Sequence, residues 1–115
     1  MIGTTSWGTT LAIILANNGS NVLLLARTQE EALALESTRE NQRMLPGIPF
    51  PPGMHASASV EEAVSGAEMV VMVVPSKSIR ENIRNLLPHL NPSSILLSAT
   101  KGLEKDSAKR MSQVM

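Results

Sequence analysis

Cysteine is absent from this sequence of 115 residues, and its only aromatic residues are Trp7 and Phe50. Without cysteine the chain has no disulfide framework and no thiolate metal site. Ten basic residues balance ten acidic ones, so the chain has neither an excess of positive charge for a phosphate backbone nor a series of stacking platforms for bases. Nucleic acid is therefore not an expected partner, and the lack of cysteine agrees with a cytoplasmic location.

Long apolar runs are missing as well. The longest cover residues 11–16 and 69–74, far below the ~20 residues that cross a bilayer, and no signal peptide is recognisable, so we expect no membrane insertion. Neither His55 nor His89 lies near a carboxylate at a suggestive spacing. We expect both histidines to have surface or packing roles, and we expect no metal site.

The remaining pattern alternates between helices and short apolar strands. Helices are predicted over residues 7–18, from the capping pair Thr28 and Glu31 to about 41, from Ser59 to near 66, and from Ser76 or Ser78 to Pro88. Strands are predicted over residues 21–26, 55–58, 69–74 and 94–99, and residues 44–54 form an irregular proline-rich loop.

Strands separated by helices predict a Rossmann-like, doubly wound α/β fold with a parallel sheet. The run 69–74 is apolar throughout, which is typical of a strand buried on both faces. Only Met1 and Ile2 precede the first glycine, in the place of the central first strand. We therefore expect residues 1–115 to be a partial domain of this fold, truncated in its first strand.

A glycine turn follows Ile2. Gly3 and Gly8 match the first and last glycines of the G-x-G-x-x-G turn, which lets a pyrophosphate approach the N-terminus of a helix. Thr5 replaces the middle glycine, and we expect its side chain to crowd the pyrophosphate. Taken alone, the turn is equally compatible with an ordinary loop that starts a helix.

The second strand ends in Ala26 and Arg27, where NAD-binding proteins commonly carry an acidic residue for the ribose. A guanidinium at this position predicts a contact to a 2′-phosphate or stacking on the adenine. The cofactor is therefore expected to be NADP or NAD, with the preference left open.

Four strings go beyond a generic fold: Ser6-Trp7-Gly8-Thr9, Leu45-Pro46-Gly47-Ile48-Pro49, Val74-Pro75-Ser76 and Ala99-Thr100-Lys101-Gly102-Leu103-Glu104. In this order and spacing the sequence resembles the N-terminal domain of bacterial NAD(P)-dependent glycerol-3-phosphate dehydrogenases. The resemblance implies a soluble enzyme that interconverts dihydroxyacetone phosphate and sn-glycerol 3-phosphate for phospholipid synthesis. Its small-molecule partner would be this phosphorylated triose.

The resemblance also implies the site residues. The expected cofactor-binding residues are Gly3, Ser6, Trp7, Gly8, Arg27, Pro75 and Lys101. Lys101 matches a lysine that contacts the substrate as well. The general base of the family belongs to a helical C-terminal domain, so no catalytic residue is assigned here, this portion alone is expected to be inactive, and a homodimer would form through parts outside it.

Two other interpretations remain open at this point. One is another dehydrogenase of the same superfamily, acting on a hydroxy acid or a sugar nucleotide. The other is a nucleotide-binding module without catalysis, which would account for Thr5.

Overall fold

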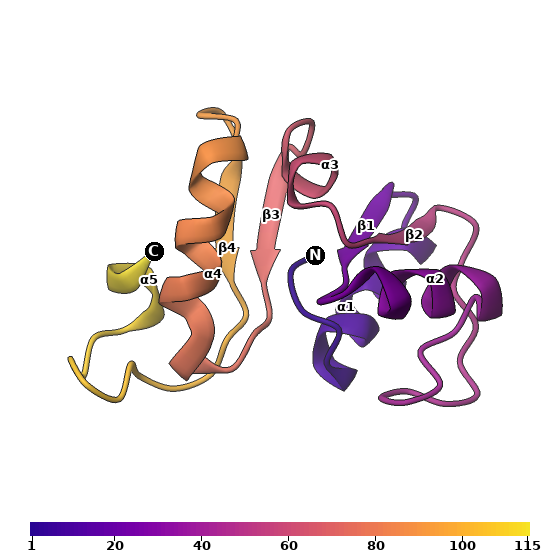
Figure 1. Ribbon diagram of the computed structural model, residues 1–115, viewed down its shortest axis with the longest axis horizontal. Coiled ribbons are helices and arrows are strands. Elements are labelled where there is room, and N and C mark those ends of the chain that lie inside the picture. The colour runs from indigo at the N-terminus through magenta and orange to yellow at the C-terminus, as the bar shows by residue number, and fades with distance from the viewer.

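The computed structural model describes residues 1–115, with the N-terminus lying between two pairs of strands (Figure 1). In chain order its elements are α1 (Ser6–Asn17), β1 (Val22–Leu25), α2 (Gln29–Thr38), β2 (Met54–Ser57), α3 (Val60–Val64), β3 (Met69–Met72), the 3₁₀ turn η1 (Ser76–Ser78), α4 (Ile79–Leu86), the 3₁₀ turn η2 (Leu87–His89), β4 (Ile95–Ser98) and α5 (Met111–Val114).

All strand pairs are parallel. β1 pairs with β2 and β3 pairs with β4, and Ile2 joins the two pairs through bridges to Leu25 and Met72. The amide of Ile2 donates to the carbonyl of Val71, and its carbonyl accepts from the amide of Val73, both at 2.8 Å. The spatial order is therefore β2, β1, Ile2, β3, β4, which confirms the predicted doubly wound α/β sheet.

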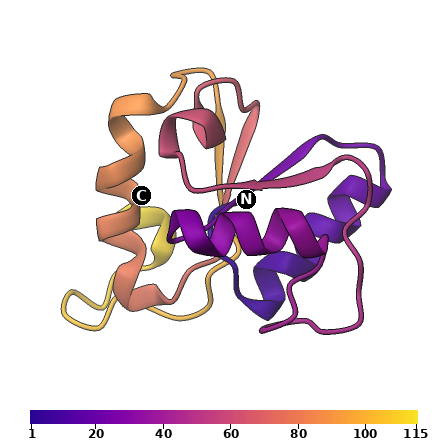
Figure 2. The same cartoon turned by 45° about the vertical axis from the view of Figure 1, so that its right-hand side comes forward.

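Successive residues of the strands face two separate hydrophobic cores. Met1, Leu24 and Val71 belong to the core under α1 and α2, whereas Ile2 and Met72 belong to the core under α3, α4 and α5. In both views α4 and α5 lie at one end of the molecule and α1 and α2 at the other, with β3 between them (Figures 1 and 2). A side chain as fully buried as Leu24 contributes ~1.5–3 kcal/mol to stability, so both faces hold the sheet.

Three of the predicted helix boundaries are confirmed. The hydroxyl oxygens of Thr28 and Ser59 accept the amides of Glu31 and Glu62 at the starts of α2 and α3, at 3.1 and 3.2 Å. Gly19 follows α1 with φ 89°, the left-handed conformation that ends a helix. Local capping chemistry therefore positions these ends.

The end of α2 was predicted three residues too late. The helix stops at Thr38 because Arg39 takes a left-handed φ of 53°. The Arg39 guanidinium then donates to the carbonyls of Pro51 and Met54, at 2.9 and 2.6 Å. These tertiary bonds tie the proline-rich loop to α2 and outweigh the local preference to continue the helix.

Other predictions about the second half were wrong in detail. Ser78 is the N-cap residue of α4, as one of the two alternatives predicted, but its hydroxyl donates to the carbonyl of Pro75 at 2.9 Å instead of accepting an amide of the helix, and Ser76 starts η1. β3 ends at Met72 rather than 74, and Met69 at its start is 44% exposed instead of buried. His55 in β2 is exposed, which agrees with the expected surface role, and its Nδ1 lies 3.5 Å from the Glu36 carboxylate.

None of the helices combines the length and the apolar character needed to cross a membrane.

The segment after β4 is attached to α4 by an ion pair. The Arg80 guanidinium donates two hydrogen bonds of 2.8 Å to the Glu104 carboxylate, which also accepts from the Ser107 hydroxyl. The hydrogen bonds from Arg80 and Ser107 lower the pKa of Glu104 to about 2 from its ordinary value of 4.5. Two-pronged pairing of this kind fixes the geometry of a loop.

We predict that this pair makes stability depend on acidity. As pH falls from 4.5 towards 2, the unfolded chain binds a proton at Glu104 before the folded chain does, so stability is lost across this range. Substitution Glu104→Gln should therefore destabilise the protein above pH 4.5 and have no effect below pH 2. Urea unfolding across this range tests it, with Glu61→Gln as the control, and a constant difference at every pH would contradict it.

Candidate nucleotide-binding site

The strand register brings four chain segments to one edge of the sheet. Ile2 lies beside Leu25 and Met72, and Met72 lies beside Ser98, so all these strands end at the same level. The segments that leave this edge carry the glycine turn, Arg27, Pro75 and Lys101. Ligands of open α/β sheets bind at the carboxyl ends of the strands.

The two glycine positions of the turn, Gly3 and Gly8, are packed too tightly for a side chain. Gly3 has φ 120°, and a Cβ atom there would lie 2.4 Å from the carbonyl oxygen of Val73. A Cβ atom on Gly8 would lie 2.2 Å from the carbonyl oxygen of Gly3. Both distances are below any real contact, so both positions require glycine. This close approach brings the first turn of α1 directly onto the strand end.

The start of α1 keeps two backbone donors free. The Thr5 hydroxyl accepts the amide of Gly8 at 3.0 Å and its carbonyl accepts the amide of Thr9, whereas the amides of Ser6 and Trp7 donate to no protein group. Free amides and the positive end of a helix dipole attract an anion. Thr5 is thus a helix cap, a role that its position in the glycine motif did not predict.

A cavity of about 540 Å³ opens beside this turn, and we call it the carboxyl-edge cavity. Gly3, Thr4 and Thr5 line one side, Arg27 and Arg43 another, and Val74 with Pro75 a third. Asn82 and Asn85 of α4 add polar groups. The cavity therefore combines backbone donors, cations and apolar walls, as a site for a phosphorylated organic ligand requires.

Four predicted residues are not part of the cavity lining: Gly8, Ser6, Trp7 and Lys101. The Ser6 hydroxyl donates to the carbonyl of Met44 at 2.6 Å, and Trp7 is 48% exposed on the first turn of α1. Lys101 is exposed and follows Thr100, whose hydroxyl donates to the carbonyl of Val74 at 2.9 Å. This bond holds the loop of Lys101 against the Val74 wall of the cavity.

Asn41 connects the glycine turn to the segment that follows α2. Its side-chain amide donates to the carbonyl of Thr4 at 3.0 Å and to the hydroxyl of Thr9 at 2.8 Å, while its carbonyl oxygen accepts the amide of Met44 at 3.2 Å. Asn41 and Thr9 are both buried. A single buried amide therefore fixes residues 41–44 over the turn.

The carboxylate of Glu31 in α2 lies at the end of β1, the place where NAD-binding proteins commonly carry an acidic residue. The Glu31 carboxylate accepts the backbone amide of Arg27 and the Thr4 hydroxyl, both at 2.8 Å, and pairs with the Arg27 guanidinium at 3.4 Å. Burial raises the pKa of Glu31, but the hydrogen bonds from Arg27 and Thr4 more than offset this, so the pKa lies below its ordinary value. Arg27 therefore borders the cavity within an ion pair.

Comparison with known families identifies the domain. Residues 1–115 match the family described as the N-terminus of NAD-dependent glycerol-3-phosphate dehydrogenase. The chain belongs to this family.

Relatives agree with this assignment. The glycerol-3-phosphate dehydrogenase [NAD(P)+] of Dehalococcoides mccartyi strain BAV1 is 49% identical over 100% of this chain and 32% of its own length. The enzyme of that name from Chlorobium phaeobacteroides is 47% identical over 98% of this chain and 34% of its own. This chain therefore spans about a third of the length of these curated relatives.

Solved structures show the same fold. The crystal structure of glycerol-3-phosphate dehydrogenase from Coxiella burnetii has a TM-score of 0.91 and 31% identity, over 98% of this chain and 34% of that one. The glycerol-3-phosphate dehydrogenase of Plasmodium falciparum has a TM-score of 0.86 at 18% identity, over 99% of this chain and 36% of that one. This second likeness concerns the fold alone.

Sequence reasoning missed Asn41, Glu31 and Arg43 as members of this dehydrogenase-family site. Asn41 was placed at the end of a helix, and Glu31 was interpreted only as half of a capping pair. Their site contacts span 27 to 37 residues along the chain, so no local spacing marks them.

We predict that Asn41→Ala destabilises the family fold. The substitution leaves the Thr4 carbonyl and the buried Thr9 hydroxyl without their partner, which costs about 1–3 kcal/mol. Urea unfolding of the natural polypeptide that carries this sequence measures the change. The exposed Asn17→Ala is the matched control, expected to remain within about 0.5 kcal/mol of wild type. Equal effects of the two substitutions would refute the anchoring role.

Proposed function

We propose that this chain is the cofactor-binding region of an oxidoreductase that interconverts dihydroxyacetone phosphate and sn-glycerol 3-phosphate with NAD(P)H. The observation that carries the proposal is the glycine turn, which holds two free amides at the carboxyl edge of the sheet beside a cavity of about 540 Å³. Membership of the family and the names of the relatives support the choice of substrate.

The residues of the site fit a dinucleotide. The turn admits no Cβ atom at Gly3 or Gly8, so the start of α1 lies against the strand end, and the amides of Ser6 and Trp7 are suited to donate hydrogen bonds to the oxygens of a pyrophosphate. The guanidinium of Arg27 lies where the adenosine end of such a ligand is held. When bound, the nicotinamide supplies a hydride to the ketone carbon or removes it from the alcohol.

The chain's own contribution is binding and orientation. Val74 and Pro75 form an apolar wall of the cavity, and α1 presents its positive end to the cofactor. Lys101, in the loop held against Val74, is the cation suited to a phosphorylated triose or its carbonyl. Orientation of the reacting groups accounts for as much as ~7–11 kcal/mol of barrier reduction in such reactions.

The family's general base and most contacts to the substrate phosphate are expected outside residues 1–115. The matches to glycerol-3-phosphate dehydrogenases favour this activity over another dehydrogenase or a module without catalysis. The cytoplasmic location and the homodimer stay predictions, which fractionation and the molar mass of the natural polypeptide would test.

We predict that the natural polypeptide oxidises NADPH when dihydroxyacetone phosphate is added, and that Lys101→Ala lowers kcat/KM by roughly tenfold or more, the effect of one lost charged hydrogen bond. Absorbance of NADPH follows the reaction. Lys105→Ala, an exposed lysine in the same loop, is the control and should keep full activity. Absence of turnover would refute the proposed reaction, and full activity of Lys101→Ala would remove that lysine from the site.

A further inference from the structure

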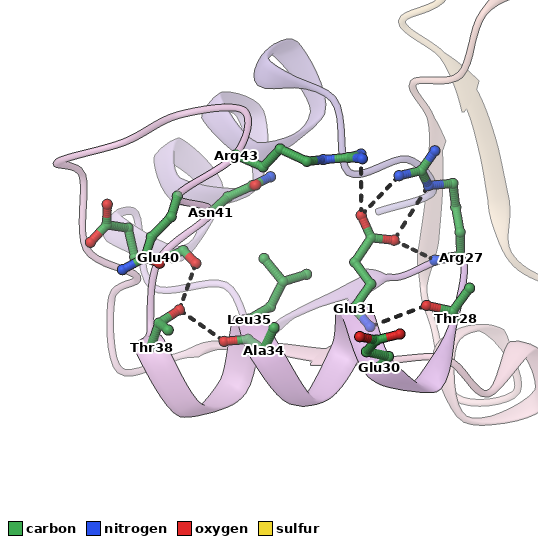
Figure 3. Close-up of a pocket in the computed structure, with 11 residues that line it drawn as sticks. Arg27, Thr28, Glu30, Glu31, Ala34, Leu35, Thr38, Glu40, Asn41 and Arg43 are labelled. Atoms are coloured by element: carbon green, nitrogen blue, oxygen red, sulfur yellow. Dashed lines mark hydrogen bonds and ion pairs between the residues drawn. The ribbon is translucent and has the colours of Figure 1, made fainter.

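A second arginine faces Arg27 across the Glu31 carboxylate. Arg43, in the segment that Asn41 fixes over the glycine turn, extends a guanidinium nitrogen to 3.6 Å from Glu31 Oε1. Figure 3 shows the two guanidinium groups reaching this carboxylate from different elements, Arg27 from the end of β1 and Arg43 from the segment after α2. Both side chains are 63% exposed.

Arg27 and Arg43 also border two cavities at once. They line the carboxyl-edge cavity, and they line a second cavity of about 510 Å³ between α2 and residues 40–43. No other arginine lines either cavity. The two cations therefore stand at the boundary between the nucleotide site and the surface along α2.

Glu31 pairs with both guanidinium groups but leaves most of their N–H donors without a partner. Its two short bonds come from the Thr4 hydroxyl and the backbone amide of Arg27, whereas its contacts to the guanidinium groups measure 3.4 to 3.6 Å. Each guanidinium carries five N–H donors, most of which remain free here. The carboxylate is itself engaged by these donors, so it is poorly placed to accept a ribose hydroxyl.

We propose that Arg43 and Arg27 together form the binding site for the 2′-phosphate of NADP(H), and that Arg43 makes the enzyme prefer the phosphorylated cofactor. The inference rests on the proposed function. The adenosine ribose of a bound dinucleotide lies just past the second strand of this fold, which is the end of β1 here. Two planar guanidinium groups match the geometry and charge of a phosphate dianion.

Glu31 is the positioning residue of this site. Its ion pairs keep two flexible arginine side chains at one point on the surface before the cofactor arrives, which reduces the entropy lost on binding. The local charge of the three side chains stays positive, with two guanidinium groups against one carboxylate. NADH, which lacks the 2′-phosphate, makes no corresponding contact.

Calorimetric titration of NADPH and NADH into the natural polypeptide tests the proposal. Arg43→Ala should raise the dissociation constant for NADPH by roughly tenfold and leave that for NADH within about twofold. Arg43→Met, which keeps the aliphatic stem, should do the same and guards against a folding effect of the smaller residue. Arg84→Ala, an exposed arginine on α4 outside both cavities, is the matched control and should change neither constant.

The possible results distinguish failure of the role of Arg43 from failure of the proposed function. If wild type binds neither cofactor, the proposed function fails and the inference fails with it. If wild type binds both and the Arg43 variants weaken neither, or weaken both equally, the role of Arg43 is overturned while the function stands. Selective loss of NADPH affinity in both Arg43 variants supports it.

Discussion

The contact between the backbones of Gly3 and Gly8 is the constraint on which the site depends. A Cβ atom on Gly8 would lie 2.2 Å from the Gly3 carbonyl oxygen, so α1 reaches the strand end only because no side chain intervenes. That approach holds the N-terminus of α1, with the free amides of Ser6 and Trp7, at the carboxyl edge of the sheet. It also places Thr4 where Asn41 and Glu31 bind it. The glycine turn is therefore the centre of a network that includes α1, α2 and the segment after α2.

This network links the packing of the fold to its electrostatics. Ile2 joins both halves of the sheet and contributes to the core under α4, while the residues that follow it form the turn. Residues 2–5 therefore both connect the two strand pairs and line the ligand site. Asn41 links the glycine turn to the segment after α2, so the position of Arg43 in that segment also depends on the turn. A change in the turn would consequently disturb both the sheet and the position of the cations.

Much of the fold was predictable because its signals are local. Apolar runs of strand length, capping residues such as Thr28 and Ser59, and the stop at Gly19 each act within a few residues. The early end of α2 was not predictable, since Arg39 stops the helix to bind carbonyls of the proline-rich loop. Local preference could not reveal bonds made across 12 and 15 residues.

The site shows the same division. Gly3, Gly8 and Arg27 were recognised from spacing, and the sheet register brings them to one edge. Thr5 was expected to crowd the pyrophosphate, yet its hydroxyl caps α1. Arg43 escaped notice because its importance comes only from its distance to Glu31. The pairing of Arg43 with Glu31 depends on how α2 packs beside the glycine turn, and no sequence motif predicts that packing.

The most direct test of this account is a crystal structure of the natural polypeptide with NADPH bound. We predict that the pyrophosphate oxygens accept hydrogen bonds from the amides of Ser6 and Trp7, at the N-terminus of α1. A pyrophosphate bound away from that helix end, with both amides left without it, would contradict the account.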